Sequence, residues 1–161
     1  MPIPSELEES ASAILDRSFI VNEAMHRAHA KWSLLAGAYA APEQELVERA
    51  LDLPRDAAEA VLRAASHSAS ALRVFAAAVE GIQRKRLELQ AEAAALEENE
   101  DLGAVPAGRL PAGNTSPTLY GLLLQSKADQ LALELSDAED ECIRALARLE
   151  RSSDAPERRG L

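Results

Sequence analysis

The chain has 161 residues, of which 47% are hydrophobic, and this length suits a single folded domain. Its formal net charge of −10 argues against a nucleic-acid-binding protein, because phosphates are neutralised by a face rich in Lys and Arg. The single cysteine, Cys142, excludes a disulfide bond within the chain. Only 3% of the residues are aromatic whereas 33 are alanine, so we expect a thin interior of close helix contacts.

The N-terminal residues Met-Pro-Ile-Pro-Ser-Glu have neither the basic start nor the apolar run of a secretory signal peptide. No segment approaches the ~18 consecutive apolar residues of a membrane-spanning helix. We therefore expect no membrane span. If the protein leaves the cell, we expect a route that does not use a cleaved signal peptide.

The first predicted helix covers residues 6–40. Ser5 followed by Glu8 has the spacing of a capping box, which predicts a helix start near Glu6. Gly37 and Pro42 weaken the helix beyond this point, so we expect its end near Ala40. Apolar or small residues recur at steps of three and four throughout, which predicts a heptad seam: Leu7, Ala11, Ile14, Ser18, Val21, Met25, Ala28, Trp32, Leu35 and Tyr39.

A short helix over residues 43–53 and a long one over residues 54–99 follow in the prediction, with Pro54 suited to the first turn of the long helix. The long helix carries two adjacent apolar rows, which indicates two neighbouring helices. The Gly- and Pro-rich segment 102–116 is a predicted linker.

The last predicted helix covers residues 117–151 and opens with Ser116-Pro117, while residues 152–161 have the composition of a disordered tail. The predicted fold is all-α. We expect an elongated antiparallel helical hairpin with a third long helix, forming a three-helix bundle that makes residues 1–151 one domain.

A metal site is the only catalytic chemistry that the sequence suggests. Glu23 and His26 form a Glu-x-x-His pair on one helix, with His29 one turn further, as in ferritin-like di-iron proteins. No second such pair exists, because the matching position before His67 is an alanine. We therefore predict no metal, no cofactor and no catalytic residue, and a chain that is not an enzyme. Cys142 lies on an apolar seam, as a buried structural thiol does.

Trp32 and Tyr39 are among the largest side chains of a chain poor in aromatic residues, and they lie one heptad apart at the end of the first helix. Two interpretations remain open for them. Either they fill the interior of the bundle at the end where the hairpin turns, or they belong to a recognition surface.

The pattern Trp32-x-x-Leu35-x-x-x-Tyr39-x-Ala41-Pro42-Glu43, followed by an amphipathic helix, resembles the WXG-like helical-hairpin domains of actinobacterial type VII secretion substrates. Such domains often form the N-terminal export module of polymorphic toxins. The resemblance covers about residues 5–100. It implies that Trp32, Leu35, Tyr39, Pro42 and Glu43 contribute to recognition by a partner or by the secretion machinery.

The resemblance implies a non-enzymatic export or targeting module that pairs with a small helical-hairpin protein and is recognised by a secretion ATPase. Such a protein would be cytoplasmic before export and then secreted. The alternative is a cytosolic scaffold or chaperone-like adaptor, which would associate with itself through the same seams, for example as a homodimer.

Overall fold

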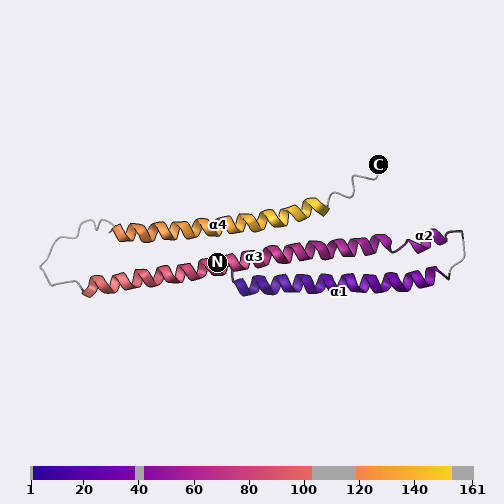
Figure 1. Cartoon of the computed structure of the whole chain (residues 1–161), viewed down its shortest axis with the longest axis horizontal. Helices are drawn as coiled ribbons and strands as arrows, with labels where there is room; N and C mark the ends of the chain where they lie inside the picture. The colour runs from indigo at the N-terminus through magenta and orange to yellow at the C-terminus, as the bar shows by residue number, and fades with distance from the viewer. Residues whose placement is uncertain (1, 39–41, 103–118, 154–161) are drawn as a thin grey trace. The chain divides into compact units, whose positions relative to one another are not determined.

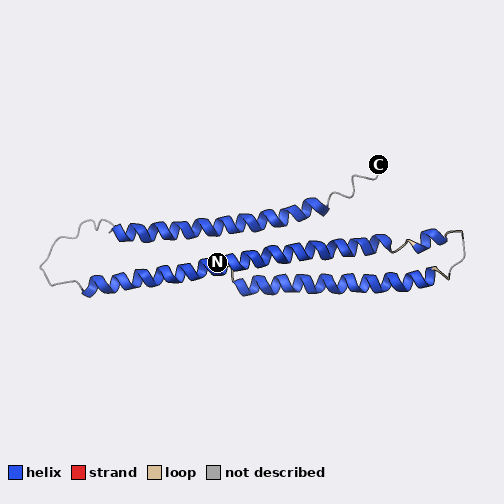
Figure 2. Cartoon of the chain, in the orientation of Figure 1, coloured by secondary structure: helices blue, strands red, loops and turns tan. Residues whose placement is uncertain are grey.

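The computed structural model describes residues 2–38, 42–102 and 119–153, and about 93% of these residues are helical. No strand occurs within these three ranges, so the predicted all-α fold is confirmed (Figure 2). Over the described residues, three long helices and one short helix follow one another along the chain (Figure 1). Their bounds are α1 Pro4–Ala36, α2 Gln44–Glu48, α3 Asp52–Leu102 and α4 Leu119–Ser153.

Helix α1 begins at Pro4, two residues before the predicted start. Its N-cap residue is Ile3, in an extended conformation, and no side chain caps the first turn. The predicted capping box at Ser5 is therefore wrong. Proline provides the physical reason, because its fixed φ favours the first helical position and its missing amide proton would be unpaired there in any case.

The other end of α1 lies at Ala36, whereas the sequence pattern suggested a helix to about Ala40. The Gly37 amide donates to the Ser33 carbonyl at 3.1 Å, and the Ala38 amide donates to the Leu35 carbonyl at 3.1 Å. The second of these bonds spans three residues rather than four, so the chain tightens and leaves the helix after the glycine. Residues 39–41, and Tyr39 with them, lie outside the described residues.

Helix α2 is a separate element of five residues, shorter than the predicted 43–53. A turn at residues 49–51 follows it, closed by the Asp52 amide, which donates to the Arg49 carbonyl at 3.0 Å. Pro54 lies in the first turn of α3 but does not open it, because α3 begins at Asp52. A proline is tolerated there because the first four amide protons of a helix have no partner within it.

Helix α3 extends to Leu102 and α4 ends at Ser153, each slightly beyond its predicted end. Apart from Leu102, the predicted linker 102–116 lies outside the described residues, as does the predicted start at Ser116-Pro117. Of the predicted tail, Ser152 and Ser153 belong to α4, and the remaining residues are not described.

The packing divides the chain into two compact units, Met1–Ala76 with Cys142–Leu161, and Ala77–Glu141. In the first unit α1 runs antiparallel to the first part of α3, because His26 lies opposite Glu59 and His29 lies opposite Asp52. In the second unit the rest of α3 runs antiparallel to the first part of α4. There Lys85 pairs with Glu134, and Glu92 pairs with Lys127.

Small side chains form the interior of the first unit. Its buried residues, among those described, are Ala11, Ser18, Ala36, Ala58, Ala65, Ala69 and Ala76. The second unit buries Val79 and Ile82. The predicted thin, alanine-rich interior is confirmed, and it follows that neighbouring helix backbones approach closely in the first unit.

The buried row of α1 differs from the predicted seam at every second member. Leu7, Ala11, Ser18, Met25 and Trp32 are buried or half-buried as predicted. The members between them are exposed: Ile14, Val21, Ala28 and Leu35. Their successors in sequence are buried or half-buried instead: Leu15, Asn22, His29 and Ala36. The four residues Ile14, Val21, Ala28 and Leu35 follow one another at seven-residue spacing and therefore face solvent on one side of α1; this row is named the α1 stripe.

Candidate functional site

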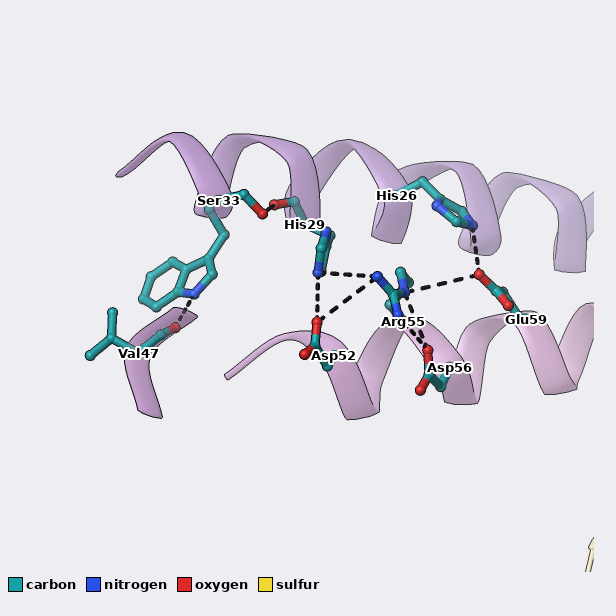
Figure 3. Close-up of polar contacts among 9 residues, drawn as sticks. His26, His29, Ser33, Val47, Asp52, Arg55, Asp56 and Glu59 are labelled. Carbon is teal, nitrogen blue, oxygen red and sulfur yellow. Dashed lines mark hydrogen bonds and ion pairs between the residues drawn. The ribbon is translucent and has the colours of Figure 1, made fainter. Parts of the chain in front are cut away.

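Trp32 joins the end of α1 to the short helix α2. Its indole Nε1–H donates a hydrogen bond of 2.6 Å to the main-chain carbonyl of Val47, and both residues are half-buried (Figure 3). Because five residues are too few for an isolated helix to be stable, α2 depends on such contacts with the rest of the chain. The indole therefore holds α2 to the end of α1 through a specific hydrogen bond.

The other predicted site residues follow Trp32 in sequence. Leu35 is 68% exposed, and Pro42 and Glu43 are exposed as well. Glu43 is the N-cap residue of α2, and its carbonyl accepts the amide protons of Leu46 and Val47 at 3.1 Å each. The structure thus joins Trp32 to α2 and leaves the side chains of Leu35, Pro42 and Glu43 exposed, while Tyr39 is outside the described residues.

A network of charged and imidazole side chains crosses between α1 and α3 next to the tryptophan. We call it the polar cluster, and Figure 3 shows its members: His26, His29, Asp52, Arg55, Asp56 and Glu59. The Nε2 atom of His29 lies 2.8 Å from Oδ1 of Asp52, and that of His26 lies 3.4 Å from Oε1 of Glu59. Arg55 contacts Asp56 at 2.9 Å and Asp52 at 3.9 Å. These contacts connect two successive turns of α1 to the start of α3.

The shorter contact of His29 decides its tautomer. The same Nε2 atom lies 3.4 Å from Nη1 of Arg55, but a nitrogen that donates its proton to Asp52 cannot also accept one from Arg55. We therefore assign the Nε2–H tautomer to neutral His29. This hydrogen bond, followed by the positive charge of Arg55, lowers the pKa of Asp52 below its ordinary value. The hydrogen bond to Asp56 raises the pKa of Arg55.

The cluster has the properties of a register device between helices. Exposed ion pairs contribute little each because water and salt screen them, so the effect of the cluster on stability is modest. Its geometry is specific, however, because sliding α1 along α3 by one turn would separate His26 from Glu59 and His29 from Asp52 together. The cluster therefore sets which residues of α1 lie opposite which residues of α3.

The Glu-x-x-His pattern of α1 is divided between two separate interactions. Glu23 lies 3.9 Å from Arg27 on its own helix, whereas His26 turns to Glu59 of α3. Among the described residues, no group of three or more His, Cys, Asp or Glu side chains could hold a metal ion. Cys142 is half-buried, and this burial raises the pKa of its thiol.

The second unit has a groove of its own between α3 and α4. It measures 290 Å³ and includes Leu89 and Leu131 among its lining residues. Two ion pairs bridge it, Lys85 with Glu134 at 2.7 Å and Lys127 with Glu92 at 2.6 Å. The hydrogen bond that Lys127 donates to the Glu92 carboxylate raises the pKa of Lys127. Because each lysine already has a carboxylate partner across the groove, these side chains hold the two helices together.

Sequence reasoning missed the polar cluster, although its parts were visible. Asp52, Arg55, Asp56 and Glu59 follow the three- and four-residue spacing of one helix face, and His26 and His29 lie one turn apart. His26 and His29 precede the predicted helix break near Pro42 by about as many residues as Asp52 and Glu59 follow it, and this symmetry in sequence was the signal that they pair.

Two further findings bear on function. None of the helices, over the residues that the structure describes, combines the length and hydropathy needed to cross a membrane. Comparison with protein-family models, curated proteins and solved structures finds no match to this chain.

Proposed function

We propose that this chain is a non-enzymatic helical module that directs or accompanies export through a type VII secretion system, paired with a small helical-hairpin protein. The observation that carries the proposal is the position of the motif that begins at Trp32 and ends at Glu43. Trp32 holds α2 through Val47, while Leu35, Pro42 and Glu43 stay exposed. Residues that recognise a partner need this combination of a rigid support and accessible side chains.

The mechanism is recognition by docking. The hairpin partner covers apolar surface of the helices, and the secretion ATPase then recognises the surface around Trp32, Tyr39 and Glu43. Chain and partner pair in the cytoplasm and leave the cell together without a cleaved signal peptide. Exposed large apolar residues on all three long helices support this role, since such surface commonly marks interaction sites.

An export assay tests the proposal. The chain is co-expressed with a small helical-hairpin protein encoded beside it, and the exported fraction is compared between wild type, Trp32→Ala and Leu35→Ala. We expect both variants to reduce export. Leu34→Ala is the matched control, because Leu34 is 80% exposed but lies outside the motif. Unchanged export of both motif variants, together with no binding of the hairpin protein, would reject the proposal.

A self-associating cytosolic scaffold or chaperone-like adaptor is the second candidate. The same exposed apolar residues favour it, because they can also be covered by a second copy of the chain. Sedimentation of the purified chain separates the two candidates. A defined homodimer that forms without any partner favours the scaffold, whereas a chain that aggregates until a hairpin protein is added favours the export module.

A further inference from the structure

The α1 stripe is an apolar line without a covering helix among the described residues. Ile14, Val21 and Leu35 are 38%, 53% and 68% exposed, and Ala28 is exposed as well. Their seven-residue spacing keeps them on one side of the helix for roughly 32 Å. This is the pattern that a second amphipathic helix recognises through its own apolar row.

The charges along one edge of the stripe are positive. The positions three residues after its members Ile14, Val21 and Ala28 are Arg17, Ala24 and Lys31. Arg17 and Lys31 are exposed, and neither makes an ion pair with another described residue. An edge with two cations and no acid is unexpected on a chain of net charge −10. This edge is therefore complementary to a negatively charged one.

We propose that the α1 stripe binds an amphipathic helix of a separate protein, and that this helix carries acidic residues opposite Arg17 and Lys31. The two acidic positions lie roughly 21 Å apart, the rise of fourteen helical residues. Charged residues that flank an apolar seam determine which helices pair. This inference rests on the proposed function, since it locates the surface that receives the hairpin partner and states the charge of that partner.

A second copy of this chain fits the stripe less well. An antiparallel pair of α1 helices, centred between Val21 and Ala28, would bring Arg17 of one copy close to Lys31 of the other. Like charges in such positions are destabilising. Two chains that each carry a net charge of −10 also repel one another at long range. The charge pattern thus disfavours pairing between the α1 helices of two copies, so we assign the stripe to a different protein.

The binding of two synthetic helical peptides to the full-length chain tests whether the stripe prefers an acidic partner. Each has about four heptads and a leucine row, and they differ only in the residues beside that row, which are Glu in one and Lys in the other. Like charges discourage each peptide from pairing with itself. Binding is followed by fluorescence anisotropy at about 50 mM and about 0.5 M NaCl. We expect the Glu peptide to bind about three- to tenfold more tightly at low salt, with a smaller difference at high salt.

Charge reversal gives the decisive comparison. The double variant Arg17→Glu, Lys31→Glu should exchange the preference, so that the Lys peptide binds more tightly. Val21→Gln should weaken both peptides, because it interrupts the apolar row. Leu34→Gln is the control, since this exposed leucine lies off the stripe. Far-UV circular dichroism shows whether each variant keeps the helix content of the wild type.

The inference would be overturned by equal binding of the two peptides, by a preference that survives charge reversal, or by equal weakening by Val21→Gln and Leu34→Gln. A homodimer that Val21→Gln dissociates would also overturn it, because a second copy would then cover the stripe. The export assay separates this failure from that of the proposed function. Trp32→Ala tests export at the bend, whereas the peptides test only the stripe.

Discussion

Replacing Trp32 with Phe should loosen α2 without unfolding the rest of the protein. Phenylalanine keeps an aromatic ring at the end of α1 but lacks the indole N–H that donates to the Val47 carbonyl at 2.6 Å. Because a five-residue helix is not stable alone, the loss should appear first as more frequent opening of α2.

The size of the effect follows from the surroundings of the bond. A hydrogen bond of this kind contributes ~0.5–1.5 kcal/mol net. The Val47 carbonyl also accepts the Ala50 amide proton at 3.3 Å, and both bonded residues are half-buried, so water can reach the freed oxygen. We therefore expect a cost of ~1 kcal/mol, which corresponds to about a fivefold increase in the open population of α2.

Amide hydrogen exchange measures this opening directly. In Trp32→Phe the amide protons of Leu46 and Val47 should exchange about fivefold faster, while those of α4 keep their wild-type rates. Phe19→Leu is the matched control, because Phe19 is an exposed aromatic residue of the same helix. Unchanged exchange at Leu46 and Val47 in Trp32→Phe would show that the indole does not hold α2.

Other predictions concern the polar cluster, the alanine core and the thiol. The hydrogen bond from His29 is the main cause that lowers the pKa of Asp52 in the folded chain. The ionised carboxylate therefore contributes its full stabilisation of the fold at pH values above its ordinary pKa of about 3.9. This stabilisation is lost as pH falls through the lower pKa of the folded state. In Asp52→Asn, the free energy of unfolding measured by urea titration should therefore fall less steeply with decreasing pH in this acidic range than it does in the wild type. An equally steep fall would refute this. Ala11 is 0% exposed, so Ala11→Leu should cost ~1–3 kcal/mol in urea unfolding, whereas Leu at the exposed Ala13 should change stability by less than ~0.5 kcal/mol. Because burial raises the pKa of Cys142, a thiol reagent should react more slowly with the folded chain than with the urea-unfolded chain at neutral pH, and equal rates would contradict this.

The long helices were predictable because apolar residues recur at steps of three and four over many turns. Their ends were less predictable, since several signals compete there. At the N-terminus Pro4 prevailed over the capping residues Ser5 and Glu8, and after Gly37 the chain left the helix earlier than the apolar pattern suggested. Pro54 indicated a break between the short and the long helix, but the break lies at residues 49–51, which contain neither Gly nor Pro, so its position was not predicted.

The orientation of α1 about its own axis was also beyond the sequence. The heptad pattern includes Ile14 and Val21, but close packing through Ala11, Ser18 and Ala36 turns these larger residues toward solvent. For the candidate site, the sequence indicated that Trp32 is important. It could not supply Val47 as the acceptor or Asp52 as the partner of His29, because both depend on how the chain folds back.

The central claim is that this chain is a docking module completed by a different helical protein, and sedimentation velocity of the chain with and without a co-purified helical-hairpin protein tests it most directly. The claim predicts a stable one-to-one complex and, without the partner, a chain that forms no defined dimer. A homodimer that is stable alone and takes up no hairpin protein would contradict it.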